Sequence, residues 1–261
     1  MTRLSGSDQR DLRHAKRLLE QTSLAIRISN VVGLPIERGI DLLPKRASAL
    51  VTTATRRALE TALRFALLTL ADEPGTRSAD LWHKALLTAT GAGGGLFGMP
   101  ALAIELPVST TLMLRSIADV ARSEGERLCL PETRLACLQV FALGGRTKAD
   151  DAVESAYFAI RGALAQALAE AAQFVAERGI AQEGAPALVR FIVQIASRYG
   201  VVVSEKTAAQ ALPILGAAGG AVVNALFMGH FQDVARGHFI VRRLERTHDP
   251  ETVRRAYADL P

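Results

Sequence analysis

The residues of this chain that could support chemistry are few, and the main candidates lie inside two long apolar stretches. Between residues 88 and 114 the only Asp, Glu, Lys or Arg is Glu105, and residues 207–232 contain none of these four types. The second stretch instead holds Asn224 and His230. Polar groups surrounded by apolar side chains need hydrogen-bond partners when they are buried. We therefore expect these three residues to be the principal buried polar groups.

Glu105 determines what the apolar stretches could do. A buried carboxylate must be paired with a donor or carry a proton. We expect Glu105 to meet Asn224 or an arginine such as Arg115 if the two stretches pack together. Such a contact would be a structural polar clamp, and the alternative is a functional carboxylate that exchanges a proton or binds a ligand. A hydrolytic site would also require His230 to join Glu105 and Asn224 in an open pocket.

The sequence carries no convincing cofactor or metal motif. Residues 93–98 match G-x-G-x-x-G, but that motif binds a dinucleotide only on a strand-to-helix turn, and the preceding residues look helical. His230 and His238 lie two helical turns apart with Asp233 between them, a wide spacing for zinc without further ligands. The patterns H-E-x-x-H, C-x-x-C and G-x-S-x-G are absent from the sequence. We expect no cofactor, no metal and no enzymatic activity.

Glycines and prolines set the shape of both apolar stretches. Glycines four residues apart share one helix face and let another backbone approach closely, and prolines inside a helix demand a break or a kink. Two interpretations stay open: helices that cross tightly inside a soluble bundle, and a helical hairpin that embeds in lipid. The glycine pairs are Gly91/Gly95, Gly94/Gly98 and Gly216/Gly220. The residues expected in the core contact, or against a ligand or lipid, are Gly91, Gly94, Gly95, Gly98, Pro100, Glu105, Pro107, Pro213, Gly216, Gly220, Asn224 and His230.

Composition and periodicity predict an all-α protein. Of the 261 residues, 49% are hydrophobic and only 5% are aromatic, so Ala, Leu and Val form an apolar mass that favours helices. We expect a single multi-helix bundle over residues 1–261, with its two glycine-rich apolar helical segments packed together. One helix is expected over residues 8–28 with Asp8 as its N-cap, and another should end at Gly200. The expected parts are basic helices in residues 1–71, a glycine-rich segment in 86–122, helices in 131–199 and a second glycine-rich segment in 204–246.

The charge distribution suits weak binding to an anionic surface. The net charge is +5, and residues 1–64 hold 12 Lys and Arg against 6 Asp and Glu. A second basic group follows the second apolar stretch and consists of Arg236, Arg242, Arg243 and Arg246. Arginines near a membrane surface attract anionic lipid by about 1 kcal/mol each. Nucleic acid is not expected as a partner, because few aromatic residues lie among the basic ones.

Cysteine usage and the first residues predict a cytoplasmic location. Cys129 and Cys137 are the only cysteines, and two thiols fit a reducing compartment better than a disulfide framework. The first 19 residues are polar and lack the apolar core of a signal peptide. We therefore expect the bulk of the chain to stay in the cytoplasm.

Three segments resemble the EcsC family of bacterial proteins. Residues 27–44 (RISNVVGLPIERGIDLLP) are similar to the opening of that family, and residues 91–107 to its first glycine-rich segment. The strongest likeness lies in residues 200–246, at Pro213, Gly216, Ala217, Gly220, Asn224, Ala235, Arg236 and Phe239. The resemblance spans about residues 15–246. It implies a helical protein, named from an operon that also encodes an ABC transporter, and it implies no settled activity.

Together these features predict a non-enzymatic protein that associates peripherally with the inner face of the cytoplasmic membrane. The glycine-rich segments would form the contact or the core, and the basic residues would face an anionic membrane surface. A role in transport, secretion or envelope physiology, and association with an ABC transporter, are implied by the family resemblance. The alternative is a soluble bundle that holds a lipid or another apolar ligand in a cavity between the glycine-rich helices. A third possibility is an uncharacterised hydrolase.

Overall fold

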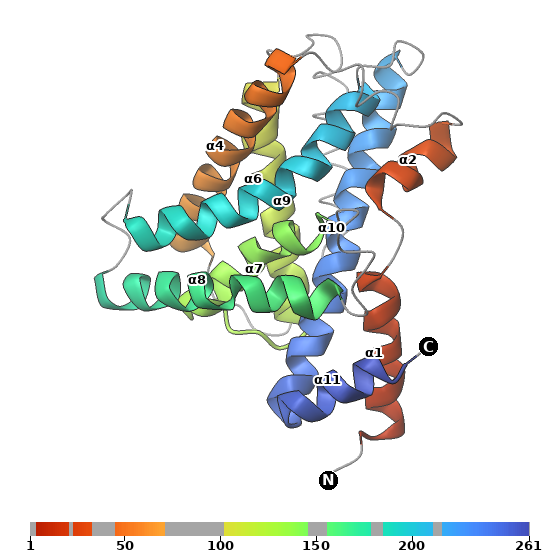
Figure 1. The fold of residues 1–261 in the computed structure, drawn as a ribbon, viewed down its shortest axis with the longest axis vertical. Coiled ribbons are helices and arrows are strands. Elements are labelled where there is room, and N and C mark those ends of the chain that lie inside the picture. The colour runs from red at the N-terminus through yellow and green to blue at the C-terminus, as the bar shows by residue number, and fades with distance from the viewer. Residues whose placement is uncertain are drawn as a thin grey trace.

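The computed structural model describes residues 4–20, 23–32, 45–70, 102–145, 156–178, 185–210 and 216–260. All regular secondary structure in these ranges is helical, which confirms the all-α prediction. The helices are α1 (Gly6–Leu19), α2 (Leu24–Val32), α4 (Lys45–Thr69), α6 (Leu102–Ser123), α7 (Pro131–Leu143), α8 (Ala156–Arg178), α9 (Pro186–Gln210), α10 (Gly216–Thr247) and α11 (Pro250–Ala258) (Figure 1).

Helices α6 and α10 run in the same direction through the bundle. Gln232 of α10 donates a hydrogen bond to Ser116 of α6 at 2.8 Å, and Arg242 reaches Glu126, just beyond the end of α6, at 2.8 Å. Helix α4 packs against α6 and α9, and α9 also packs against α10. Helices α1 and α11 lie at the end of the molecule where α10 finishes, whereas α2 lies towards the end where α10 begins (Figure 1).

Aromatic rings from three helices meet at the centre of the core. Phe141 of α7, Tyr199 of α9, and Phe227 and Phe231 of α10 are all fully buried. The centroids of Phe141 and Tyr199 are 4.8 Å apart, and those of Phe227 and Phe231 are 5.3 Å apart in an edge-to-face arrangement. Such pairs contribute about 0.5–1.5 kcal/mol beyond the area they bury. The ring cluster therefore fixes how α7, α9 and α10 pack together.

Several helices begin at the residues that capping chemistry favours. Pro131 is the first residue of α7, a position that suits proline because its missing N–H would have no partner there. Asp249 caps α11 by accepting a hydrogen bond from the Thr252 amide. The prediction for α1 is wrong: Ser5 is the N-cap, and its hydroxyl accepts from the Asp8 amide. The Ser5 hydroxyl also donates to the Asp8 carboxylate, so Asp8 supports the cap from within the first turn.

Two predicted helix boundaries differ from the structure. The helix expected over residues 8–28 is two helices, because α1 ends at Leu19 and α2 begins at Leu24. The end expected at Gly200 is wrong, since α9 continues through Gly200 to Gln210. Glycine ends a helix when it adopts a positive φ. Among the described residues only Gly125 has a positive φ, so Gly200 keeps the helical conformation.

Pro107 lies inside α6 and does not interrupt it. A proline lacks the N–H that would bond to the carbonyl four residues earlier, which here is Ala103, in the first turn of α6. The Thr111 hydroxyl donates to the Pro107 carbonyl at 2.8 Å. Because only one backbone hydrogen bond near the start of α6 is lost, the helix tolerates Pro107. The structure therefore has no break at this residue.

Helix α9 is the one described helix that is long and apolar enough to cross a membrane. Its most apolar window has a mean hydropathy of 1.4, and 39% of that window is buried inside the protein. A core helix of a soluble protein has the same properties, so length and composition alone are weak evidence.

Candidate functional site

The buried acid expected at the centre of the apolar stretches is paired with a lysine. The Lys206 ammonium of α9 lies 2.7 Å from the Glu105 carboxylate of α6. The Lys206 side chain has no exposed surface, and that of Glu105 is 10% exposed. The predicted partners were therefore wrong, and Arg115 instead lies over the Phe65 ring, 5.7 Å from its centroid.

Lys206 lies in apolar surroundings, so its charge depends on the Glu105 carboxylate. Its ammonium is 4.9 Å from the centroid of the Phe227 ring, and Phe227 is itself fully buried. Burial lowers the pKa of Lys206, and the charge and hydrogen bond of Glu105 oppose that shift. A desolvated cation over an aromatic face is stabilised by the ring as well as by the carboxylate. The pair therefore ties α6 to α9 next to the ring cluster.

Two further buried polar pairs connect α6 to its neighbours. The Thr110 and Tyr199 hydroxyls are 2.9 Å apart and join α6 to α9. Ser116 accepts from Gln232 of α10. Together with Glu105 these residues form a line of buried polar contacts along α6, which we call the α6 polar row. Burial raises the pKa of Tyr199, with Thr110 opposing and Glu105 adding to the shift, so the phenol stays neutral.

His230 and Asn224 are buried, as predicted. His230 Nε2 lies 2.9 Å from the Gly144 carbonyl, and because a carbonyl only accepts, Nε2 is the protonated nitrogen. Burial lowers the pKa of His230 to about 4, although the Gly144 hydrogen bond opposes the shift. His230 is therefore a neutral residue that joins α10 to the end of α7. Since Glu105 and His230 have different partners, the structure does not support the hydrolytic arrangement.

A second buried histidine, His238, which the sequence suggested only as a poorly spaced zinc ligand, belongs to a network between α8 and α10. Arg161 donates two hydrogen bonds to Glu245, at 2.8 and 2.6 Å, and a longer one to the Tyr157 hydroxyl at 3.4 Å. The same hydroxyl is hydrogen-bonded to His238 Nδ1, 2.9 Å away. Burial raises the pKa of Tyr157 to about 12 and lowers that of His238 well below its ordinary value.

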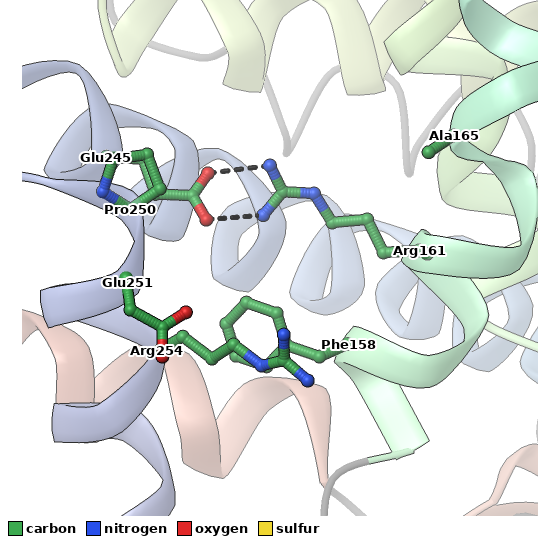
Figure 2. Close-up of a pocket in the computed structure, with 8 residues that line it drawn as sticks. Phe158, Arg161, Ala165, Glu245, Pro250, Glu251 and Arg254 are labelled. Atoms are coloured by element: carbon green, nitrogen blue, oxygen red, sulfur yellow. Dashed lines mark hydrogen bonds and ion pairs between the residues drawn. The ribbon is translucent and has the colours of Figure 1, made fainter.

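This network opens onto a small surface pocket between α8 and α11. Figure 2 shows the Arg161–Glu245 ion pair on its wall, with Phe158, Glu251 and Arg254 around the opening. The cavity volume is about 270 Å³. Arg254 lies over the Phe158 ring, 5.9 Å from its centroid. Arg161 and Glu245 satisfy each other, so this pair provides neither an activated base nor an uncompensated cation.

The arginines expected at an anionic surface face carboxylates of the same chain. Glu126, whose side chain is 4% exposed, receives hydrogen bonds from Arg242 and Arg246. Burial alone would raise the pKa of Glu126, but these two arginines keep it below its ordinary value. Arg243 pairs with Asp11 at 2.8 Å, and it also meets Glu124.

The fourth arginine, Arg236, also acts on Glu124. Burial raises the pKa of Glu124, and the charges of Arg243, Arg236 and Arg246 oppose the shift. The predicted basic stripe is thus an intramolecular ion-pair network that joins α1, α10 and the segment after α6. We do not assign these arginines to a lipid surface.

Several predicted site residues fall outside the part of the chain that the structure describes. They are Gly91, Gly94, Gly95, Gly98, Pro100 and Pro213. Of the remaining candidates, Gly216 begins α10, and Gly220 is a buried residue of the same helix. Among the described residues, no three His, Cys, Asp or Glu side chains are grouped so that they could hold a metal ion. Burial raises the pKa of Cys137, which makes this thiol a poor nucleophile.

Lys206 is the functional-site candidate that sequence reasoning missed. It immediately precedes the uncharged stretch that starts at residue 207, so the charge pattern of that stretch does not include it. The signal was its helical spacing: Lys206 follows Val203, Val202 and Tyr199 by three, four and seven residues, and all three are buried. A lysine on the apolar face of a helix needs a buried partner, and Glu105 is the acid in the other apolar stretch.

Comparison with known proteins identifies the family of this chain and nothing more specific. The chain gives no match among curated proteins or among solved structures. The model of the EcsC protein family matches residues 7–244, which include every helix from the first full turn of α1 to the last turns of α10. The chain therefore belongs to the EcsC protein family.

Proposed function

We propose that this protein is a non-enzymatic helical protein that associates peripherally with the inner face of the cytoplasmic membrane. The observation that carries the proposal is a group of exposed apolar side chains at the end of the bundle where α6 and α10 begin. Ile104 is 76% exposed, Val108 is 48% exposed and Val222 of α10 is 42% exposed. We call this group the apolar end.

The positions of these residues along the chain favour a common surface over scattered exceptions. Ile104 and Val108 are four residues apart on α6, so they share one helix face. Helices α6 and α10 begin at the same end of the molecule (Figure 1). Helix α2 lies towards the same end (Figure 1), and its Val31 is 59% exposed. Single exposed apolar residues are common, whereas a group of them is typical of a contact with lipid or protein.

The chain connectivity adds a second argument. The chain enters α6 from the glycine-rich residues 86–101 and enters α10 from residues 211–215, both strongly apolar. The sequence immediately before each of these two helices is therefore apolar, like the side chains of Ile104 and Val222. The arginines of α10 belong to an ion-pair network and are not needed for this contact. The contact would depend on apolar burial more than on surface charge.

Sedimentation with liposomes of phosphatidylethanolamine and phosphatidylglycerol tests the proposal. We expect binding that persists at about 1 M salt, where the Debye length is only about 3 Å. Ile104→Asp should reduce partitioning at least about tenfold, because placing a carboxylate in lipid costs about 2–3 kcal/mol. Leu68→Asp is the matched control, since Leu68 is 69% exposed near the end of α4, away from the apolar end. Absence of binding by the unmodified protein, or equal loss in both variants, would contradict the proposal.

The family resemblance adds a protein partner to this proposal. A protein held at the membrane surface is placed to meet the membrane-embedded subunits of an ABC transporter. Crosslinking in membranes that contain the transporter, followed by purification of the transporter, should recover the unmodified protein and lose Ile104→Asp. Recovery of the unmodified protein and the Ile104→Asp variant in equal amounts would show that transporter binding does not depend on the apolar end.

A further inference from the structure

A groove between α4 and α9 has the shape of a ligand site. Its cavity volume is about 470 Å³, within the range of roughly 300–1,000 Å³ that small-molecule sites occupy. It is separate from the apolar end and from the pocket of Figure 2, because it shares no lining residue with either. The lining residues are Val51, Thr52, Arg56, Val193, Ala196, Ser197, Gly200, Val201 and Ser204.

Small residues of α9 keep the groove open. Ala196, Gly200 and Ser204 follow one another at intervals of four residues, so they share one helix face. A Cβ atom built on Gly200 would meet no heavy atom within 4 Å. Glycine destabilises a helix interior relative to alanine. At residue 200 no neighbouring atom is close enough to exclude a larger side chain. The empty space above Gly200 therefore belongs to the groove and is not used by packing within the described residues.

The walls of the groove are apolar, and its hydroxyl groups are already engaged. Val51, Val193 and Val201 supply the apolar side chains. Ser197 donates its proton to the Gln194 carbonyl, and Ser204 donates to the Gly200 carbonyl, both at 2.8 Å. Neither serine needs a proton acceptor from a ligand. The interior of the groove thus suits a chain of methylene groups.

The one charged side chain among the lining residues is Arg56. Its side chain is 61% exposed. It pairs with Glu60 of the same helix at 3.6 Å, and the Glu60 side chain is also exposed. An exposed pair of this kind contributes little and is easily exchanged for another anion. Arg56 presents a planar fork of donors that matches a carboxylate or a phosphate. The groove therefore combines an apolar channel with a cation at its rim.

We propose that this groove binds a single-chain anionic amphiphile, with the acyl chain over Gly200 and the carboxylate or phosphate at Arg56. The charge pattern favours this occupant over a helix of a second copy, because the only lining charge is one rim arginine. The inference does not depend on the apolar end, since none of the residues argued for that surface lines the groove. Fatty acids and lysophosphatidic acids share the required chemistry.

Fluorescence and calorimetric titrations with oleate, below its aggregation concentration, test the groove. We expect saturable binding of one oleate per chain. Gly200→Leu fills the groove with a side chain that meets no neighbour, so the fold is retained and the affinity falls at least about tenfold. Gly162→Leu is the matched control, because a Cβ on Gly162 of α8 likewise meets nothing within 4 Å. It should bind oleate like the unmodified protein.

The head group is tested with Arg56→Gln. This variant should weaken binding of oleate several-fold and leave binding of oleyl alcohol unchanged. A larger loss with lysophosphatidic acid than with oleate would identify the phosphate as the natural head group, and the reverse would identify the carboxylate. Each of three results would overturn the proposal: no saturable binding, equal loss in Gly200→Leu and Gly162→Leu, or a Gly200→Leu variant that instead changes the oligomeric state. Liposome binding by Gly200→Leu should be unchanged, so the two proposals can fail separately.

Discussion

Glu105 and Lys206 carry opposite charges 2.7 Å apart, and the lysine has no exposed surface. Desolvation of such a pair offsets much of its attraction, so the pair is a source of specificity more than of net stability. Removing one partner is different, because it leaves the other charge buried alone. The pair therefore predicts a strongly non-additive response to substitution.

Glu105→Gln should lower the free energy of unfolding by about 3–5 kcal/mol, because Lys206 loses its counter-charge. The double variant Glu105→Leu/Lys206→Met should come within about 1 kcal/mol of the unmodified protein or exceed it. Urea denaturation of the single and double variants measures both values. Additive effects would show that the two side chains do not interact in solution.

The buried His230 predicts a pH dependence of stability. Its folded pKa of about 4 lies below its ordinary value of 6.5, so the unfolded chain binds more protons between these values. This contribution to stability is complete above pH 6.5 and decreases as the pH falls towards 4. Between pH 7 and pH 5 the loss from His230 alone is about 2 kcal/mol.

His230→Gln tests this assignment, since the amide of glutamine keeps a donor for the Gly144 carbonyl but does not titrate. The variant should lose about 2 kcal/mol less than the unmodified protein between pH 7 and pH 5. Denaturation curves at the two pH values provide the measurement. An unchanged slope would mean that His230 is not the group that takes up the proton.

At the scale of elements, glycine has opposite roles in two helices. A Cβ on Gly237 of α10 would lie 2.7 Å from the Leu19 side chain and 3.0 Å from the Ala15 carbonyl of α1. The α1–α10 contact thus requires a glycine. A Cβ on Gly162 of α8 would meet nothing within 4 Å. The close helix approach expected from the glycine content occurs here at Gly237, which belongs to no predicted pair.

Gly237→Ala should therefore destabilise the protein by about 1–3 kcal/mol, because α1 must move away from α10. Gly162→Ala should stabilise it by up to about 1 kcal/mol through helix propensity. Thermal unfolding of both variants shows the difference as melting temperatures that move in opposite directions. A Gly237→Ala variant as stable as the unmodified protein would show that α1 can move away from α10 without a loss of stability.

The sequence predicts element types here better than element ends. Apolar spacing and the lack of alternation identified helices throughout the described residues. The ends depend on backbone conformation, which residue type only biases: Gly200 stays helical because no positive φ is required there. Ser5, not Asp8, became the cap of α1 because α1 starts one turn earlier than its apolar pattern. Tertiary contacts decide these positions, and single-sequence patterns do not contain them.

At the scale of the whole molecule, charge and apolar surface are separated. The ion-pair network of Glu126, Arg242 and Arg246 lies where α6 and α10 finish, and the apolar end lies where they begin. The sequence indicated the arginines of α10 but not the residues of the apolar end, and it could not show which end of the molecule each set occupies. The arginines of α10 interact with Glu124 and Glu126, which are far away in the sequence but are folded against them.

This separation predicts that stability and membrane binding respond to different substitutions. Glu126→Gln should cost about 3 kcal/mol, since two arginines lose a buried partner, and should leave liposome binding of the folded protein unchanged. Glu132→Gln is the control, because Glu132 is 60% exposed and 3.7 Å from Arg242. That variant should change stability by less than about 1 kcal/mol. Urea denaturation and liposome sedimentation measure the two properties, and loss of liposome binding in Glu126→Gln would show that they are coupled.

The common direction of α6 and α10 has an electrostatic consequence for the apolar end. Aligned peptide dipoles give each helix the equivalent of about half a positive charge at its N-terminus. Both N-termini lie at the apolar end, and Glu105 in the first turn of α6 is already matched by Lys206. The backbone itself therefore makes this end electropositive without a basic side chain. Anionic head groups would be attracted by the orientation of the helices, and replacing arginines would not remove that attraction.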